Sequence, residues 1–257
     1  MVEAQPEEFD TDLGETPAVA AEIFGERLEL AERYAELLAD AGVRRGLIGP
    51  REVPRLWERH ILNCAVAQAA FPHGVDVIDV GSGAGLPGLA LAISRPDLTL
   101  HLVEPMLRRT TWLLGAVGDL ALPNVVVHRG RAEEYAGRLE TSWATARAVA
   151  RIDRLARWTF PLLADGGTLV ALKGSQAGEE LVAQDRVLRG LGMVSAEVKA
   201  YGEGQLEVPT VTLELVVGPR TRSGTSRRKS TSATRRRASQ TGGAARPDLP
   251  RWFASPP

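Results

Sequence analysis

A glycine-rich stretch, VDVIDVGSGAGLPG, contains residues whose types and spacing could hold a nucleotide-containing cofactor. Gly81, Gly83 and Gly85 occupy every second position after an apolar run, and glycines there let a ligand approach the backbone closely. Asp79 stands just before them, where a carboxylate would repel a pyrophosphate but attract a cation or an amine. Leu86 occupies the position at which the dinucleotide fingerprint G-x-G-x-x-G requires its third glycine. The loop therefore favours S-adenosylmethionine (SAM), which carries a sulfonium and an α-amino group, over NAD; a tight turn without a ligand is the alternative.

An acidic residue follows at a place suited to binding a ribose. The predicted strand Leu98–Val103 ends in Glu104, about twenty positions after the glycine loop, and a carboxylate there can bind ribose hydroxyl groups. An exposed carboxylate at a strand end is the alternative interpretation. Asp79, the three glycines and Glu104 together are typical of a class I SAM-dependent methyltransferase.

The elements that would position these residues alternate between short strands and helices, which predicts βαβ units and a mainly parallel sheet. The predicted strands cover residues 75–81, 98–104, 124–129, 143–149, 167–173, 194–201 and 209–217. The predicted helices between them cover residues 86–94, 106–120, 153–163 and 178–190. The last two strands are joined by the loop GEGQLEVP without a helical crossover, so they should form an antiparallel hairpin at the sheet edge. The predicted fold is thus α/β, a Rossmann-like class I methyltransferase with a seven-stranded, mainly parallel sheet.

Two helical stretches precede the sheet. An apolar stripe predicts a helix from Val19 to Ala41, and a second stretch runs from about Arg51 to Phe71. The predicted parts of the chain are an acidic, disordered tail (1–17), a helical cap (18–73), the SAM-binding domain (74–218) and a basic, disordered tail (219–257). The arginine clusters of the last part could bind RNA phosphate or be dispensable.

The composition is that of a soluble globular protein, with 257 residues of which 44% are hydrophobic and 25% charged. Cys64 is the single cysteine, which excludes a disulfide framework and a cysteine-rich zinc site, and we expect no metal. The N-terminus is acidic and lacks the apolar region of a signal peptide, and no run of about 20 apolar residues predicts a membrane span. We therefore expect a cytoplasmic protein, with a monomer as the default.

Basic residues concentrate in the loops that should follow the carboxyl ends of the strands, where doubly wound sheets bind their ligands. These basic residues are Arg108, Arg109, Arg131, Arg147, Arg151 and Lys173. The carboxylates cluster at the predicted SAM site, and the Arg and Lys residues would line the substrate side. This division suits a cationic cofactor that faces a polyanionic substrate. For Lys173, at the end of the fifth predicted strand, an ordinary surface lysine is the alternative. The N/D-P-P-Y/F motif of DNA amino-methyltransferases is absent, and Cys64 lies in a predicted N-terminal helix, away from the place of a cytosine-C5 nucleophile.

Six segments, in this order, resemble the RsmG (GidB) family of bacterial 16S rRNA guanine-N7 methyltransferases: RHILN, DVGSGAGLPGLALAI, LVEPMLRRTTWL, RAEE, ARAVA and LKG. The resemblance covers about residues 25–217. It implies methyl transfer from SAM to N7 of guanine 527 in the 530 loop of 16S rRNA, with the small ribosomal subunit as partner. Guanine N7 carries a lone pair and no proton, so no essential general base is expected. Asn63-Cys64 and Pro105 depart from the family's usual Asp-Ser and Ser.

The resemblance also implies roles for individual residues. The residues expected to bind SAM are Asp79, Gly81, Ser82, Gly83, Gly85, Leu86, Glu104, Ala132, Glu133 and Arg147, with Ala132-Glu133 beside the adenine. Arg147 and Lys173 are expected to assist catalysis by positioning the substrates. The residues expected to contact RNA are His60, Arg109 and Lys173.

Other functions remain open from the sequence. A SAM-dependent methyltransferase acting on a small molecule or a protein would share the cofactor signature but would not require rRNA. A non-catalytic RNA-binding or ribosome-assembly factor could retain a SAM fold, although it would be expected to lose the cofactor residues, and here they are all present. An NAD oxidoreductase ranks last because of Leu86 and the predicted C-terminal hairpin.

Overall fold

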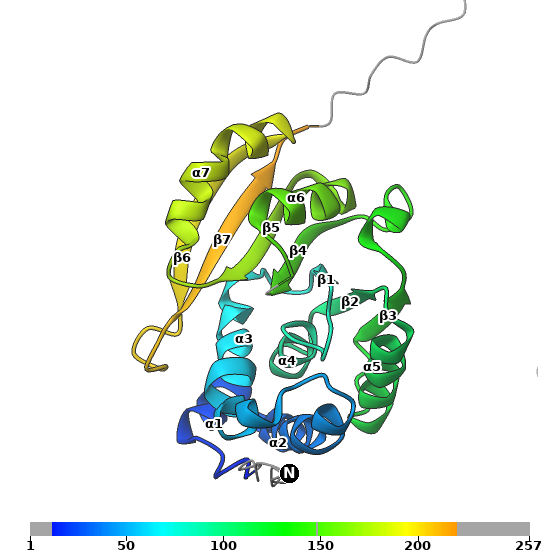
Figure 1. Cartoon of the computed structure of the whole chain (residues 1–257), viewed down its shortest axis with the longest axis vertical. Helices are drawn as coiled ribbons and strands as arrows, with labels where there is room; N and C mark the ends of the chain where they lie inside the picture. The colour runs from blue at the N-terminus through cyan, green and yellow to red at the C-terminus, as the bar shows by residue number, and fades with distance from the viewer. Residues whose placement is uncertain (1–11, 148, 220–257) are drawn as a thin grey trace, which may run out of the picture. The chain divides into compact units, whose positions relative to one another are not determined.

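The computed structural model describes residues 12–147 and 149–219, and in this part of the chain the central element is a seven-stranded sheet (Figure 1). Its strands are β1 (Asp76–Val80), β2 (Thr99–Glu104), β3 (Val125–Arg129), β4 (Thr141–Arg147), β5 (Leu163–Lys173), β6 (Met193–Tyr201) and β7 (Thr210–Val217). They lie in the order β3-β2-β1-β4-β5-β7-β6. Strands β1 to β5 pair in parallel, whereas β7 is antiparallel to both β5 and β6. This arrangement confirms the predicted fold class, including the C-terminal hairpin.

Helices cover both faces of the sheet. Helices α4 (Gly88–Ser94) and α5 (Leu107–Asp119) pack with the N-terminal helices on one face, and α6 (Ile152–Thr159) and α7 (Ala177–Gly190) pack on the other. Neighbouring residues of a strand point to opposite faces, so Val77 belongs to the first core and Ile78 to the second. Because both faces of the sheet are covered, β1 is buried at every position after its first residue, Asp76.

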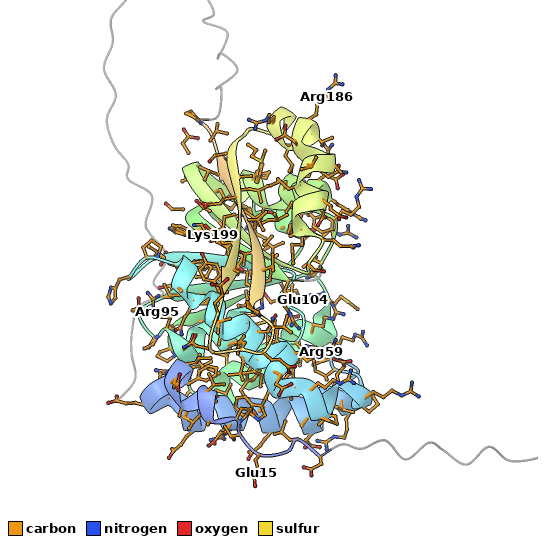
Figure 2. The ribbon with its side chains drawn as sticks, turned by 90° about the vertical axis from the view of Figure 1, so that its left-hand side faces the viewer. Glu15, Arg59, Arg95, Glu104, Arg186 and Lys199 are labelled. Atoms are coloured by element: carbon orange, nitrogen blue, oxygen red, sulfur yellow. The ribbon has the colours of Figure 1, made fainter. Side chains whose placement is uncertain are left out.

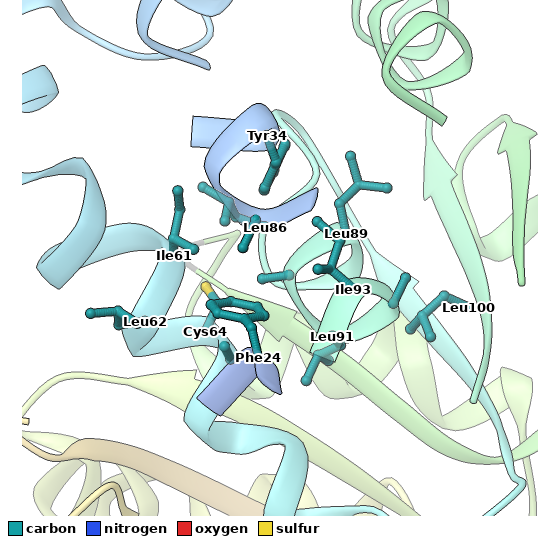
Figure 3. Packing of buried hydrophobic residues seen from close by; sticks show 14 of the residues in the cluster. Phe24, Tyr34, Ile61, Leu62, Cys64, Leu86, Leu89, Leu91, Ile93 and Leu100 are labelled. Atoms are coloured by element: carbon teal, nitrogen blue, oxygen red, sulfur yellow. The ribbon is translucent and has the colours of Figure 1, made fainter. Parts of the chain in front are cut away.

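The N-terminal cap shares the first core with the sheet. Its elements are α1 (Ala18–Phe24), η1 (Gly25–Arg27), α2 (Leu28–Leu37), η2 (Leu38–Gly42), η3 (Pro50–Arg55), η4 (Trp57–Leu62), α3 (Asn63–Ala65) and η5 (Val66–Ala70). Figure 3 shows Phe24, Tyr34 and Cys64 of the cap near Leu89 and Ile93 of α4. Because these buried side chains form one cluster, the cap and the sheet belong to one compact unit.

A single arginine adds a polar link between the cap and the sheet. Arg95, labelled in Figure 2, precedes β2 and donates hydrogen bonds to the carbonyls of Gln68, Phe71 and Pro72, each at 3.1 Å. Its Nε and Nη2 also donate to the two carboxylate oxygens of Asp97, at 2.7 Å each. The end of the cap is thereby fixed against the amino-terminal end of the parallel strands.

The structure corrects several predicted boundaries. The helix predicted from Val19 to Ala41 is interrupted at Gly25, whose φ of +53° does not continue an α-helix. Strand β5 begins at Leu163 rather than at residue 167, because Gly166 adopts a φ of +78° and a register shift in the β4–β5 pair accommodates the irregular start. The helix before it therefore ends at Thr159, earlier than predicted.

The described chain also begins inside the segment predicted to be disordered. Leu13 packs against the first core, and Thr16 Oγ1 donates a 2.9 Å hydrogen bond to Glu32. The prediction for residues 1–17 is therefore wrong for 12–17, because an apolar side chain and a hydroxyl find partners on the cap. Residues 1–11 and the predicted basic tail from residue 220 lie outside the described residues. Within the described residues, the helices are all too short or too polar to span a bilayer.

Candidate functional site

A cavity of about 580 Å³ opens at the carboxyl ends of β1, β2, β3 and β4, beside residues of the cap. Ten of the residues predicted to bind cofactor or RNA line it: His60, Gly81, Ser82, Gly83, Leu86, Glu104, Arg109, Ala132, Glu133 and Arg147. Three predicted residues are outside its lining: Asp79, Gly85 and Lys173. Folding thus brings together residues from the cap and from four separate strand ends, as expected for a doubly wound sheet.

The glycine loop after β1 is held from both sides. Its Ala84 carbonyl accepts hydrogen bonds from the Tyr34 hydroxyl of the cap, at 3.1 Å, and from Trp112 Nε1 of α5, at 2.9 Å. Gly83 has a φ of +57°, and a Cβ built on it would meet no atom nearer than 3.7 Å. The backbone at Gly83 is therefore fixed in a left-handed conformation with open space in front of it, which leaves room for a ligand.

Gly85 is required for packing rather than for access to the cavity. A Cβ there would lie 2.4 Å from a methyl carbon of Leu89 and 2.9 Å from the Tyr34 hydroxyl. Its φ of +102° also disfavours any side chain. The alternating glycines, which look equivalent in the sequence, therefore have different structural roles.

Asp79 does not face the cavity, contrary to its predicted role as a partner for the cofactor's positive groups. Its side chain is completely buried, and its Oδ2 accepts a 3.0 Å hydrogen bond from the backbone N–H of Gly88, at the start of α4. Oδ1 has no hydrogen-bond partner among the described residues. Burial raises the pKa of this carboxyl to about 7. The side chain anchors the helix that follows the loop.

Glu104 occupies the position expected for a ribose-binding carboxylate. Its Oε2 accepts a 3.0 Å hydrogen bond from the N–H of Gly83, and its Oε1 accepts one of 2.9 Å from Met106 N–H. Arg109 approaches the same carboxylate at 3.7 Å. The side chain is 1% exposed, yet it lines the cavity. Two backbone donors thus hold the carboxylate in one orientation, and its remaining lone pairs can accept hydroxyl groups.

Arg147, at the end of β4, is held by the cap. Its Nη1 donates a 3.1 Å hydrogen bond to the carbonyl of Arg59, and its Nη2 lies 2.8 Å from Nδ1 of His60. The Nε2 of His60 lies 2.8 Å from Oε2 of Glu52. Burial lowers the pKa of His60, and the hydrogen bond with His60 lowers the pKa of Glu52. Glu52, His60 and Arg147 all line the cavity.

Lys173, predicted to contact RNA, is outside the lining of the cavity and makes its contacts with other residues of the protein. Its Nζ donates hydrogen bonds to the carbonyl of Ala150, at 3.1 Å, and to the carboxylate of Glu180, at 3.0 Å. The same carboxylate accepts a 2.7 Å hydrogen bond from the N–H of Ile152. Lys173 and Glu180 therefore hold the segment that follows β4.

Comparison with known proteins decides the family. The family model described as rRNA small subunit methyltransferase G (GidB) matches residues 27–208. The chain belongs to the GidB family. The ribosomal RNA small subunit methyltransferase G of Pseudarthrobacter chlorophenolicus is 54% identical over 198 residues, covering 77% of this chain and 92% of that protein. The protein of the same name from Thermobifida fusca is 53% identical over 206 residues, covering 80% of this chain and 87% of that protein.

A solved structure supports the fold independently of the family. A protein from Methanococcus maripaludis, assigned to the SAM-dependent methyltransferases, superposes with a TM-score of 0.50 at 14% identity. The match covers 74% of this chain and 93% of that chain. At that identity the likeness shows only the class I methyltransferase fold. The GidB match begins at residue 27 and therefore includes most of the cap as well as the sheet.

Sequence reasoning missed several residues of the site in this GidB member. Glu52 precedes His60 by about two helical turns, a spacing that places two residues on one helix face but carries a weak signal by itself. Arg154 and Trp158 of α6 also line the cavity, with the guanidinium of Arg154 4.9 Å from the indole centroid. Their spacing of four residues on a helix could have suggested the pair. Only the fold shows that it faces the cavity.

Proposed function

We propose that this GidB-family protein transfers the methyl group of SAM to N7 of guanine 527 in the 530 loop of 16S rRNA. Family membership supports rRNA methylation in general. The observation that carries the proposal is one cavity that joins the glycine loop, Glu104 and the Ala132-Glu133 pair to Arg147 and the cap. The specific atom and nucleotide come from the resemblance between this chain's motifs and those of the family.

The residues present fit SAM. The open space before Gly83 allows the cofactor to lie against the backbone, and Glu104 can accept its ribose hydroxyls. Ala132 and Glu133, which follow β3, lie on the lining where an adenine would be expected. The cavity volume of about 580 Å³ is within the range of small-molecule sites. When bound, SAM supplies an electrophilic methyl group on a sulfonium.

The chain's own contribution is the positioning of the two substrates. Guanine N7 needs no deprotonation, so the protein has to orient the lone pair toward the methyl group and provide a suitable electrostatic field. The fixed loop, the buried Glu104 and the guanidinium of Arg147 hold their orientations without any ligand. Little reorganisation is then needed when the substrates bind. The protein is further proposed to be a cytoplasmic monomer that acts on the small ribosomal subunit.

Labelled SAM tests this function directly. The protein is incubated with small subunits from a strain that lacks this gene, and the modified base is mapped by N7-specific chain cleavage. We expect label on one guanine of the 530 loop. Glu104→Gln should weaken SAM binding roughly 10- to 100-fold, because the amide replaces an acceptor that the ribose hydroxyls require. The control Glu203→Gln changes an exposed carboxylate and should bind SAM normally. SAM binding without label on subunits or free 16S rRNA would refute the rRNA substrate.

A further inference from the structure

The contacts of Arg147 define the protonation of His60. A guanidinium has N–H donors and no acceptor, so the 2.8 Å contact between Nη2 of Arg147 and Nδ1 of His60 requires Nδ1 to accept. Nδ1 is then unprotonated, and the single proton of the neutral ring is on Nε2. That proton is donated to Oε2 of Glu52 at 2.8 Å. The hydrogen bonds run in one direction, from Arg147 to His60 to Glu52.

The surroundings of His60 favour this neutral form. The charged groups that face it are Glu52 from η3, Arg147 from β4 and Arg59 from its own element, η4. Burial lowers the pKa of the imidazole, and Arg147 and Arg59 act in the same direction, while Glu52 opposes them. Protonation of Nδ1 would place two cationic donors against each other and break the contact with Arg147.

The fixed guanidinium has donors left for a ligand. Arg147 has five N–H groups, and the described residues accept from Nη1 and Nη2 through Arg59 and His60 only. The side chain lines the cavity beside the glycine loop and Glu104. An oxygen acceptor in the cavity is therefore the natural partner for the remaining donors.

We propose that Glu52 and His60 are positioning residues that hold the guanidinium of Arg147 toward an oxygen acceptor of the bound substrates. The proposal rests on the methyl transfer proposed above. Two acceptors share the required chemistry: the carboxylate of SAM and O6 of the target guanine. O6 is next to N7 on the same edge of the base, so an arginine there would leave N7 free for the methyl group.

Variants of His60 separate positioning from proton transfer. His60→Asn retains an acceptor near the position of Nδ1 but cannot titrate, whereas His60→Ala removes the acceptor. His60→Ala should lower kcat/KM for small subunits about 10- to 100-fold, as for loss of a hydrogen bond to a charged group. In the wild type, protonation of His60 breaks its contact with Arg147, so kcat/KM should fall at acidic pH. His60→Asn should stay within about fivefold of the wild type at neutral pH and lose this fall. The control His73→Asn changes a ring that is 88% exposed and should leave both quantities unchanged.

Glu52→Gln tests the second link of the chain of hydrogen bonds. The amide oxygen can still accept from Nε2 of His60, but the negative charge that favours the protonated ring is gone. The acidic limb of the rate profile should therefore move to lower pH. SAM affinity then identifies the acceptor: a parallel loss in His60→Ala and Arg147→Ala indicates the SAM carboxylate. Unchanged SAM affinity with reduced kcat/KM for subunits indicates guanine O6.

A measurement that needs no RNA can test the positioning role of His60 even if the proposed function is wrong. Nitrogen NMR of the full chain should show His60 with a protonated Nε2 and a bare Nδ1 at neutral pH. The opposite tautomer, or a doubly protonated ring, overturns the proposal even if the subunits are methylated. An equal loss of kcat/KM in His60→Asn and His60→Ala also overturns the proposal, as does a fall in rate at acidic pH that persists in His60→Asn. If the wild type does not methylate subunits, the proposed function fails while the tautomer and SAM binding still decide the positioning role.

Discussion

Replacing Asp79 by Asn should change how the stability of this protein depends on pH. The Asp79 carboxyl is completely buried, and its pKa is about 7 against an ordinary value of 3.8. The native state therefore retains a proton that the unfolded chain releases, and native stability falls as the pH rises through this window. A difference of roughly three pKa units corresponds to about 4 kcal/mol, of which more than half falls between pH 5 and pH 8.

Asn is the matched substitution because it has a similar size and stays neutral at every pH. Its amide oxygen can accept the hydrogen bond from Gly88 N–H that Oδ2 of Asp79 accepts at 3.0 Å. Urea unfolding of both proteins should be followed at pH 5, 6, 7 and 8. Relative to the wild type, Asp79→Asn should gain about 2–3 kcal/mol of unfolding free energy between the lowest and highest pH.

The comparison of slopes removes the contribution of all other titrating groups. Asp119→Asn, which changes an exposed carboxylate on α5, is the control and should follow the wild-type slope. Equal slopes for the wild type and Asp79→Asn would show that Asp79 titrates alike in the folded and unfolded chain. The argument from burial would then be wrong.

Two further substitutions test the packing and the polar link described above. Gly85→Ala should destabilise the fold by about 2 kcal/mol or more in thermal unfolding, because the new Cβ collides with Leu89 in a backbone conformation that favours glycine. The control Gly115→Ala adds a methyl group in open space on α5 and should be neutral or stabilising. Arg95→Ala should lower the free energy of unfolding in urea by about 2–3 kcal/mol, because Asp97 and three cap carbonyls lose their hydrogen-bond donor. A decrease below about 0.5 kcal/mol would show that water replaces the arginine.

The sequence by itself determined the fold class and most of the predicted residues that line the cavity. Alternating strand and helix patterns, the short loop before the last strand and the glycine-rich turn are local signals, so they are readable without the fold. The placement of Glu104 followed from the same reasoning, since carboxyl ends of parallel strands meet at one edge. The family resemblance rested on motif order and was confirmed by the family match over residues 27–208.

Only the tertiary structure decided which of the chemically plausible residues face the cavity. Asp79 and Lys173 were expected there because of their positions along the chain. In the structure, the Asp79 carboxylate holds the start of α4 and the Lys173 ammonium binds Glu180. Glu52 was not expected, because its role depends on a contact with Arg147 made through His60, whose partner lies 87 residues away. Side-chain direction and long-range contacts are set by packing between distant elements, and no local pattern encodes them.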